Sequence, residues 1–152
     1  MTAALQIRSA ASSRAWASRK RRAVVLAAIA DSERHTAKRV ALTLSTVPPS
    51  VNNMFANKRT GGRVKSAEYK AWRAMAVAEL RTIQRAPLIR GKVRIRLAIE
   101  RPNASSDLSN RLKAIEDALV EANVIEDDRL IEGYDRFEWA PIQGVEIEVR
   151  AA

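Results

Sequence analysis

The segment from residue 107 to residue 128 concentrates the side chains best suited to chemistry. At 100° per residue, Asn110, Lys113 and Asp117 lie on one face of a helix. Asp107 stands where that helix is predicted to begin, and the helix dipole favours an anion there. The acidic residues that follow the helix are Glu126, Asp127 and Asp128. If the chain folds back after the helix, carboxylates from both of its ends converge beside Lys113.

Carboxylates grouped in this way suit a hard cation. Mg²⁺ binds through one or two carboxylates and keeps several waters for chemistry, and a neighbouring ammonium group can neutralise charge on a phosphate in the transition state. A purely structural interpretation stays open for each piece. Asp107 can be a helix N-cap, Lys113 and Asp117 an exposed i,i+4 ion pair, and Asp127-Asp128 a turn.

The composition excludes several other chemistries. The chain has 152 residues and 47% hydrophobic residues, enough for the core of one domain. It has no cysteine, which excludes disulfides, thiolate zinc sites and cysteine nucleophiles. It has one histidine, His35, so a histidine-rich metal site is excluded too.

Charge points to a polyanionic partner. Lys and Arg number 27 against 17 Asp and Glu, which gives a net charge of +10. Nucleic acid is the first class of partner that this balance indicates, and an anionic membrane surface is the second. The longest apolar run near the start, residues 23–30, is far shorter than the roughly 20 residues of a membrane span. Residues 1–38 are Arg-rich and predict a basic N-terminal extension, for which disorder and a short helix over residues 23–30 are both open.

The remaining sequence predicts one α+β domain over residues 39–152. Alternation predicts strands over 40–45, 92–100, 129–139 and 145–150, with a hairpin turn at 141–144 between the last two. Helices are predicted over 66–85 and 107–122, the second with an apolar stripe of Leu108, Leu112, Ile115 and Leu119. Residues 48–65 read as a basic loop. The order β-α-β-α-β-β predicts a mixed sheet of about four strands with two helices on one face.

Five motifs in a fixed order carry a resemblance. They are Pro48–Asn53, Ser66–Arg73, Arg101-Pro102 followed by Asp107–Ala114, Glu116–Leu119, and Val124–Ile131. Together they resemble the RusA family of Holliday-junction resolvases, the crossover junction endodeoxyribonucleases of bacteria and their phages, over about residues 41–150.

The resemblance implies a homodimeric, Mg²⁺-dependent endonuclease that makes paired symmetric nicks in four-way DNA junctions during recombination and repair, with Mn²⁺ as a substitute ion. It implies Asp107, Lys113 and Asp128 as catalytic residues. Asp107 and Asp128 would bind the metal, with Asp127 and Asp117 as further candidates. The chain departs from the family pattern at Ser109, where the family has a second acid. A hydroxyl is a weaker ligand, so metal number and rate depend on what replaces that carboxylate.

The expected DNA-binding residues are Asn52, Asn53, Phe55, Lys58, Arg59, Arg63, Lys65, Asn110 and Arg111. The cations would bind phosphates without reading sequence. Phe55 either wedges between bases or packs on the domain. Arg94 and Arg96 share the polar face of one strand and can serve a DNA surface, a solvated face or a dimer contact.

The expected partners are branched DNA and a second copy, with no membrane and no small-molecule cofactor, in the cytoplasm at the nucleoid. Two other functions stay open. Because of Ser109, the chain could bind branched DNA without cutting it. A basic RNA-binding protein is the other, but the strand face of Arg94, Arg96 and Ala98 lacks the stacking aromatics that such a protein needs.

Overall fold

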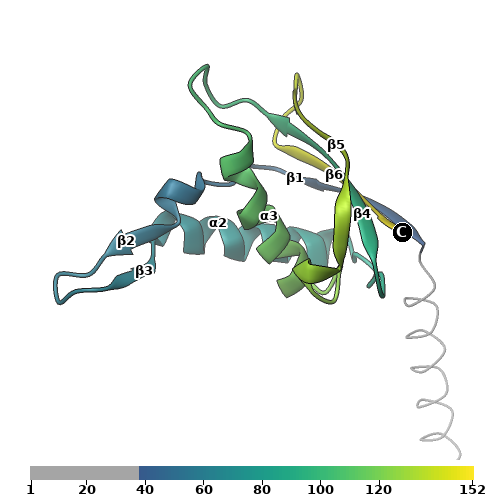
Figure 1. Cartoon of the computed structure of the whole chain (residues 1–152), viewed down its shortest axis with the longest axis horizontal. Helices are drawn as coiled ribbons and strands as arrows, with labels where there is room; N and C mark the ends of the chain where they lie inside the picture. Colours follow the sequence, from purple (N-terminus) through teal and green to yellow (C-terminus); the bar gives the residue numbers. More distant parts are fainter. Residues whose placement is uncertain (1–37) are drawn as a thin grey trace, which may run out of the picture. The chain divides into compact units, whose positions relative to one another are not determined.

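The computed structural model describes residues 38–152 (Figure 1). The predicted N-terminal extension, including the helix expected over residues 23–30, lies outside the described residues. Four strands form the main sheet: β1 (Arg39–Leu44), β4 (Val93–Glu100), β5 (Ile131–Ala140) and β6 (Val145–Ala151). The helices are α2 (Ala67–Ala78), continued by a π-turn η2 (Glu79–Ile83), and α3 (Ser109–Glu121). The α+β class and the mixed four-stranded sheet are therefore confirmed.

The strand order corrects one prediction. The order is β1-β6-β4-β5, so β5 and β6 are not the hairpin that the turn at residues 141–144 suggested. β4 lies between them, parallel to β5 and antiparallel to β6. Of the four strands, β4 has the most buried residues, and its central position lets a neighbouring strand shield each of its edges.

The core lies between the helices and one face of this sheet. Val93, Ile95, Leu97 and Ile99 on β4 are each at most 1% exposed, as their alternation predicted. From α3 the buried residues are Ala114, Ile115, Ala118 and Leu119. The predicted stripe was thus right at Ile115 and Leu119, whereas Leu108 and Leu112 are only partly buried. The two alanines belong to the buried face because small side chains let the helix approach the sheet closely.

Helix α2 begins where its cap predicted. The Ser66 hydroxyl accepts a hydrogen bond from the backbone N–H of Tyr69 at 3.1 Å. Tyr69, Trp72, Ala76 and Leu80 follow at helical spacing and are buried. The α-helical part ends at Ala78, and the π-turn then carries the chain to Ile83, slightly short of the predicted residue 85.

Residues 48–65 are more ordered than the predicted loop. A short 3₁₀ turn η1 (Val51–Asn53) leads into a two-stranded hairpin of β2 (Phe55–Asn57) and β3 (Arg63–Lys65). The turn depends on glycine, because Gly61 and Gly62 have φ of +89° and +84°. Figure 1 shows this hairpin extending from the body as an arm. No helix among residues 38–152 is long and apolar enough to cross a membrane.

Candidate active site

Lys113 is the centre of the candidate site. Its Nζ donates to Asp128 Oδ2 at 2.5 Å and lies 2.9 Å from Asp117 Oδ1. Asp117 is one turn further along α3, and Asp128 begins the 3₁₀ turn η3 (Asp128–Leu130) after the helix. The chain therefore folds back after α3, and it brings Asp128 to the helix face that the sequence predicted.

The two carboxylates fix the protonation state of Lys113. Its pKa is raised well above the usual range, first by the hydrogen bond to Asp128 and then by that to Asp117. The ammonium group therefore stays charged at neutral pH. A charged ammonium group has no lone pair to accept a proton, so the role that this arrangement favours for Lys113 is electrostatic.

Asp107 is held at the beginning of the same helix. Its Oδ1 accepts from the Ser109 backbone N–H at 3.0 Å and from the Ser109 hydroxyl at 2.8 Å. Its Oδ2 accepts from the Asn110 side chain at 3.1 Å. Helix α3 starts at Ser109, two residues later than predicted, and its N-cap residue is Leu108, which makes no side-chain capping bond. Asp107 therefore lies just outside the helix and accepts bonds from its first two residues.

Asp127 is engaged by a different cation. Its carboxylate accepts from the Arg129 backbone N–H and Nε, both at 2.9 Å, and from Arg129 Nη2 at 2.7 Å. These bonds hold the pKa of Asp127 well below its ordinary value. Asp127 and Asp128 are neighbours in sequence, but only Asp128 contacts Lys113.

Two tyrosines that sequence reasoning did not assign to the site donate hydrogen bonds to its carboxylates. The buried Tyr69 on α2 donates to Asp117 Oδ2 at 2.9 Å, and Tyr134 on β5 donates to Glu116 Oε1 at 2.6 Å. Glu116 lies 4.0 Å from Lys113 Nζ. For Tyr69 a signal existed, since a buried phenol needs a polar partner. No sequence signal connects Tyr134 to Glu116.

A hollow of about 440 Å³ joins this cluster to the base of the hairpin arm. Its charged lining residues are Lys65, Arg73, Asp117, Glu121, Asp127 and Asp128. Lys65 belongs to β3, and its ammonium group lies 4.9 Å from the centre of the Tyr69 ring. Carboxylates of the cluster and a cation of the arm therefore border the same space.

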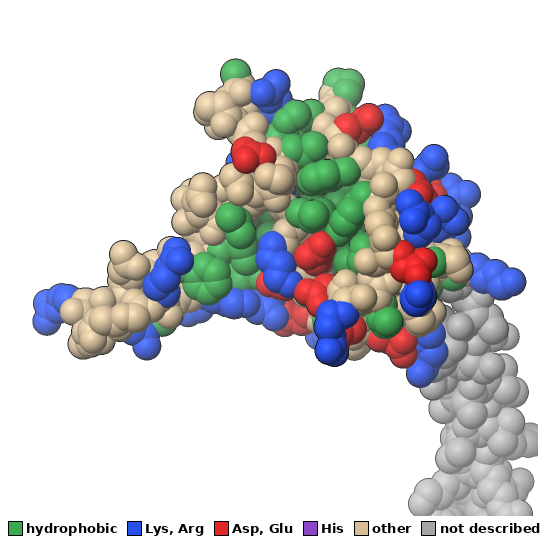
Figure 2. Space-filling model, in the orientation of Figure 1, with side chains coloured by type: hydrophobic (Ala, Val, Ile, Leu, Met, Phe, Trp, Pro, Cys, Tyr) green, Lys and Arg blue, Asp and Glu red, His purple; other side chains and the backbone are tan. Residues whose placement is uncertain are grey.

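The arm carries most of the expected DNA-binding residues. Phe55, Lys58, Arg59 and Arg63 are exposed, and Arg63 lies over the Phe55 ring at 5.3 Å. Figure 2 shows Lys and Arg side chains along the arm and at its tip. Asn52 and Asn53 are exposed on η1, where the arm leaves the body.

Arg111 differs from these residues. Its Nη1 donates to the Pro48 carbonyl at 2.6 Å, and burial lowers its pKa. The guanidinium group therefore ties α3 to the segment that precedes the arm. Asn110 is likewise engaged, since its side chain donates to Asp107.

The chain also matches a known protein family over the region that holds this cluster. The profile of the endodeoxyribonuclease RusA family matches residues 46–150. The chain belongs to the RusA family. Among proteins with curated descriptions, none matches it. The RusA match begins just before the arm and ends in β6, so it covers every residue of the cluster around Lys113.

The candidate site offers carboxylate oxygens as possible ligands of a divalent ion. Within residues 38–152, no three His, Asp or Glu side chains lie close enough together to hold a metal ion by themselves. Asp117 and Asp128 do converge on one cationic point, the Lys113 ammonium group. Mg²⁺ needs only one or two carboxylates besides water, so the donor chemistry of Asp128 suits this ion. Among residues 38–152, Asp107 bonds only to Ser109 and Asn110, and it makes no hydrogen bond or ion pair with Lys113, Asp117 or Asp128.

Proposed function

We propose that the chain is a Mg²⁺-dependent, structure-selective endonuclease that resolves four-way DNA junctions by paired symmetric nicks, in recombination and repair. The observation that carries the proposal is the meeting of Lys113, Asp117 and Asp128 at the base of a basic arm. Membership of the RusA family supports it.

The residues would divide the work as follows. Asp107 and Asp128 would hold Mg²⁺ or Mn²⁺, with Asp117 and Asp127 as further carboxylates. When bound, the ion supplies an activated water for attack on a phosphodiester. Lys113, charged at neutral pH, stabilises the negative charge that develops on the phosphate.

The arm would bind the junction. Lys58, Arg59, Arg63 and Lys65 contact phosphates, which gives affinity without sequence selectivity. Phe55 is 40% exposed, so its ring is available to wedge between bases where strands exchange. Two symmetric nicks need two sites related by a two-fold axis, so the active species is a homodimer.

A cleavage assay on a synthetic four-way junction tests this function. The linear duplex of the same sequence is the matched substrate, and each is incubated with Mg²⁺, with Mn²⁺ and with EDTA. We expect nicks at opposed positions of the junction, dependent on the divalent ion, and an intact duplex. Equal cutting of both substrates, or unchanged cutting in EDTA, would contradict the proposal.

One observation favours a second function. The Ser109 hydroxyl donates to Asp107, so the residue that replaces a family acid consumes acceptor capacity of a proposed metal ligand. Under this alternative the chain binds branched DNA and does not cut it. Tight, selective binding of the junction with no cutting in Mg²⁺ or Mn²⁺ would establish the alternative.

A further inference from the structure

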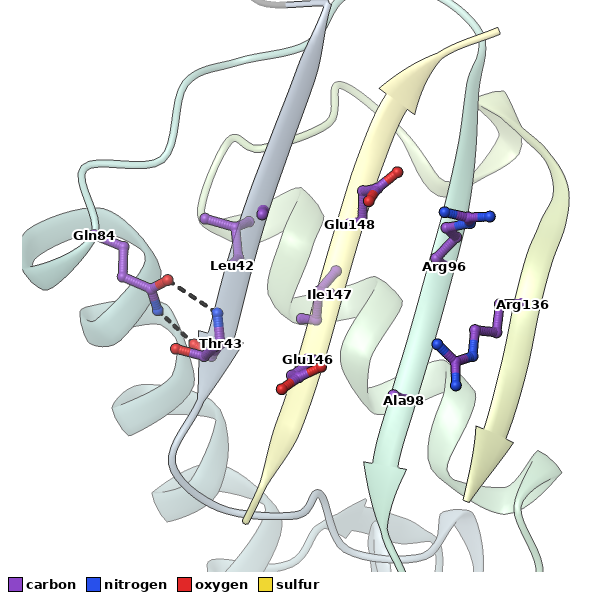
Figure 3. Close-up of a pocket in the computed structure, with 10 residues that line it drawn as sticks. Leu42, Thr43, Gln84, Arg96, Ala98, Arg136, Glu146, Ile147 and Glu148 are labelled. Atoms are coloured by element: carbon purple, nitrogen blue, oxygen red, sulfur yellow. Dashed lines mark hydrogen bonds between the residues drawn. The ribbon is translucent and has the colours of Figure 1, made fainter. Parts of the chain in front are cut away.

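The face of the main sheet that α2 and α3 do not cover bears the outward residues of all four strands; we call it the open face. On β4 these residues are Arg94, Arg96, Ala98 and Glu100, which alternate with the buried core residues. Figure 3 shows the middle of this face, with Glu146 and Glu148 on β6 beside Arg96 on β4 and Arg136 on β5. The open face is therefore charged but not uniformly basic.

Charge on the open face changes sign along the strands. One end groups the register neighbours Arg39, Arg150 and Arg94. Asp135 lies 2.6 Å from Arg94 and 2.9 Å from Arg150, and Arg39 pairs with Glu148 of the next row at 2.5 Å. At the other end the charged residues are acids: Glu146 and Glu138, which flank Ala98, and then Glu100. Glu138 forms an ion pair with Arg136 of the neighbouring row. The row between the two ends holds Glu148, Arg96 and Arg136. Basic and acidic ends therefore stand at opposite ends of one surface.

The sum of these charges is zero. Counting the residues just named, five arginines stand against five acids, in a chain whose net charge is +10. Lys92 and Glu132 add an ion pair of 2.5 Å at the basic end and no net charge. A polyanion gains little from a surface without net charge, so nucleic acid is not the partner that this face fits.

The middle of the open face is hollowed. A depression of about 310 Å³ lies over Ala98, bordered by Arg96, Arg136 and Glu146. Within residues 38–152, Arg96 and Glu146 form no ion pair with each other and no side-chain hydrogen bond, although they stand on adjacent strands. An exposed arginine thus lies next to a depression whose rim offers a carboxylate that is free to accept hydrogen bonds.

We propose that the open face binds the open face of a second copy, with the strands of the two sheets running in opposite directions. A two-fold axis in the interface, perpendicular to the strands, puts the basic end of each copy over the acidic end of the other. Arg96 of each copy then enters the depression over Ala98 of its partner, between Glu138 and Glu146. Face-to-face sheets with nearly aligned strands are a standard packing.

A second copy fits this face better than an unrelated partner for a geometric reason. A surface with a charge gradient is complementary to its own image under a two-fold rotation, which reverses the gradient automatically. The packing also leaves the Lys113 cluster free, because α3 lies on the other side of the sheet (Figure 1). The inference gives the proposed dimeric nuclease its interface. It rests on the proposed function only for the reason why two copies should pair.

Charge reversal in the full-length chain tests the interface. Sedimentation equilibrium without DNA or metal, near 0.15 M salt, should give the mass of two copies. Arg96→Glu places a third acid opposite Glu138 and Glu146 of the partner and should weaken pairing at least 100-fold. Glu146→Arg should weaken pairing at least tenfold.

An equimolar mixture of the two variants should pair at least tenfold more tightly than either variant alone. In the mixed pair, the glutamate introduced at position 96 of one copy meets the arginine introduced at position 146 of the other, and the remaining Arg96 meets the remaining Glu146. Lys70→Glu on α2 is the matched control and should leave the mass unchanged.

Three results would overturn the inference: a single-copy mass for the unaltered chain, a two-copy mass for both variants, or no recovery on mixing. Recovery on mixing also separates a lost contact between copies from damage within one copy, since damage within a copy is not repaired by a second variant. The mass measurement needs no cutting. A chain that pairs through Arg96 but never cuts refutes the nuclease and keeps the interface, and a chain that cuts but pairs elsewhere does the opposite.

Discussion

The hairpin arm and the open face of the sheet both carry several cations, yet their charge patterns differ. Residues 48–65 carry four cations, Lys58, Arg59, Arg63 and Lys65, and no acid. The open face carries as many acids as arginines, arranged from a basic end to an acidic end. A surface with cations and no acids, like the arm, attracts a polyanion in any orientation. A surface with balanced charges arranged in a gradient, like the open face, favours one orientation of one partner.

The net charge of the chain therefore says little by itself about where a partner binds. The excess of cations indicated nucleic acid correctly as a class of partner for a RusA-family chain. It did not indicate which surface meets DNA. The sequence left three roles open for Arg94 and Arg96: a DNA surface, a solvated face or a dimer contact. Both belong to the open face, whose charges balance, and Arg94 forms an ion pair with Asp135.

The largest effect should come from the cluster at the base of the arm. Asp128→Asn removes the carboxylate that holds Lys113 at 2.5 Å, and we expect cutting of a four-way junction to fall at least 100-fold. Junction affinity should be equal or higher, because a negative charge next to DNA is lost. Single-turnover cutting and a gel-shift titration measure the two quantities. Glu68→Gln, the same chemical change on an exposed residue of α2, is the control; a normal rate for Asp128→Asn would remove Asp128 from the site.

The next effect distinguishes the arm from the rest of the surface. Replacing Lys58, Arg59 and Arg63 by alanine should lower junction affinity at least tenfold near 0.15 M salt. The slope of log affinity against log salt should become shallower by about 2.7, at roughly 0.9 for each phosphate contact. Lys70→Ala on α2 should leave that slope unchanged. An unchanged slope in the triple variant would show that the arm does not meet phosphates.

Much of this molecule could be predicted from local patterns. The alternation of β4, the Ser66 cap and the helical spacing of Lys113 and Asp117 are all properties of neighbouring residues, and the structure confirms them. Strand order was predicted wrongly, because the turn after β5 is compatible with a hairpin and with a crossing over β4. The pairing of Tyr134 with Glu116 depends on that same tertiary arrangement, so no local pattern reveals it.

A smaller effect is expected at Ser109. Ser109→Asp replaces the hydroxyl that donates to Asp107 by a second carboxylate next to the first. Without metal the like charges should lower the melting temperature slightly; with Mg²⁺ the added ligand charge should strengthen binding. Half-maximal cutting should therefore need several-fold less Mg²⁺, and Mg²⁺ should raise the melting temperature more than in the unaltered chain. An unchanged Mg²⁺ requirement together with slower cutting would show that the site uses another ligand, such as Asp117 or Asp127.

The smallest effect is expected at Tyr69 and Tyr134, whose hydroxyl groups donate to carboxylates of the cluster. Tyr69→Phe removes the hydrogen bond to Asp117 and should lower the free energy of unfolding by about 1 kcal/mol, the usual contribution of such a bond. Tyr134→Phe removes the bond to Glu116 and should cost a similar amount, which makes the two variants a matched pair for urea denaturation. Their cutting rates should differ, because Asp117 lies 2.9 Å from Lys113 and Glu116 lies 4.0 Å away. We expect Tyr69→Phe to slow single-turnover cutting about fivefold, the rate equivalent of about 1 kcal/mol, and Tyr134→Phe to slow it less. Equal rates at equal stability loss would mean that Tyr69 supports the fold alone and that the position of Asp117 does not limit the reaction.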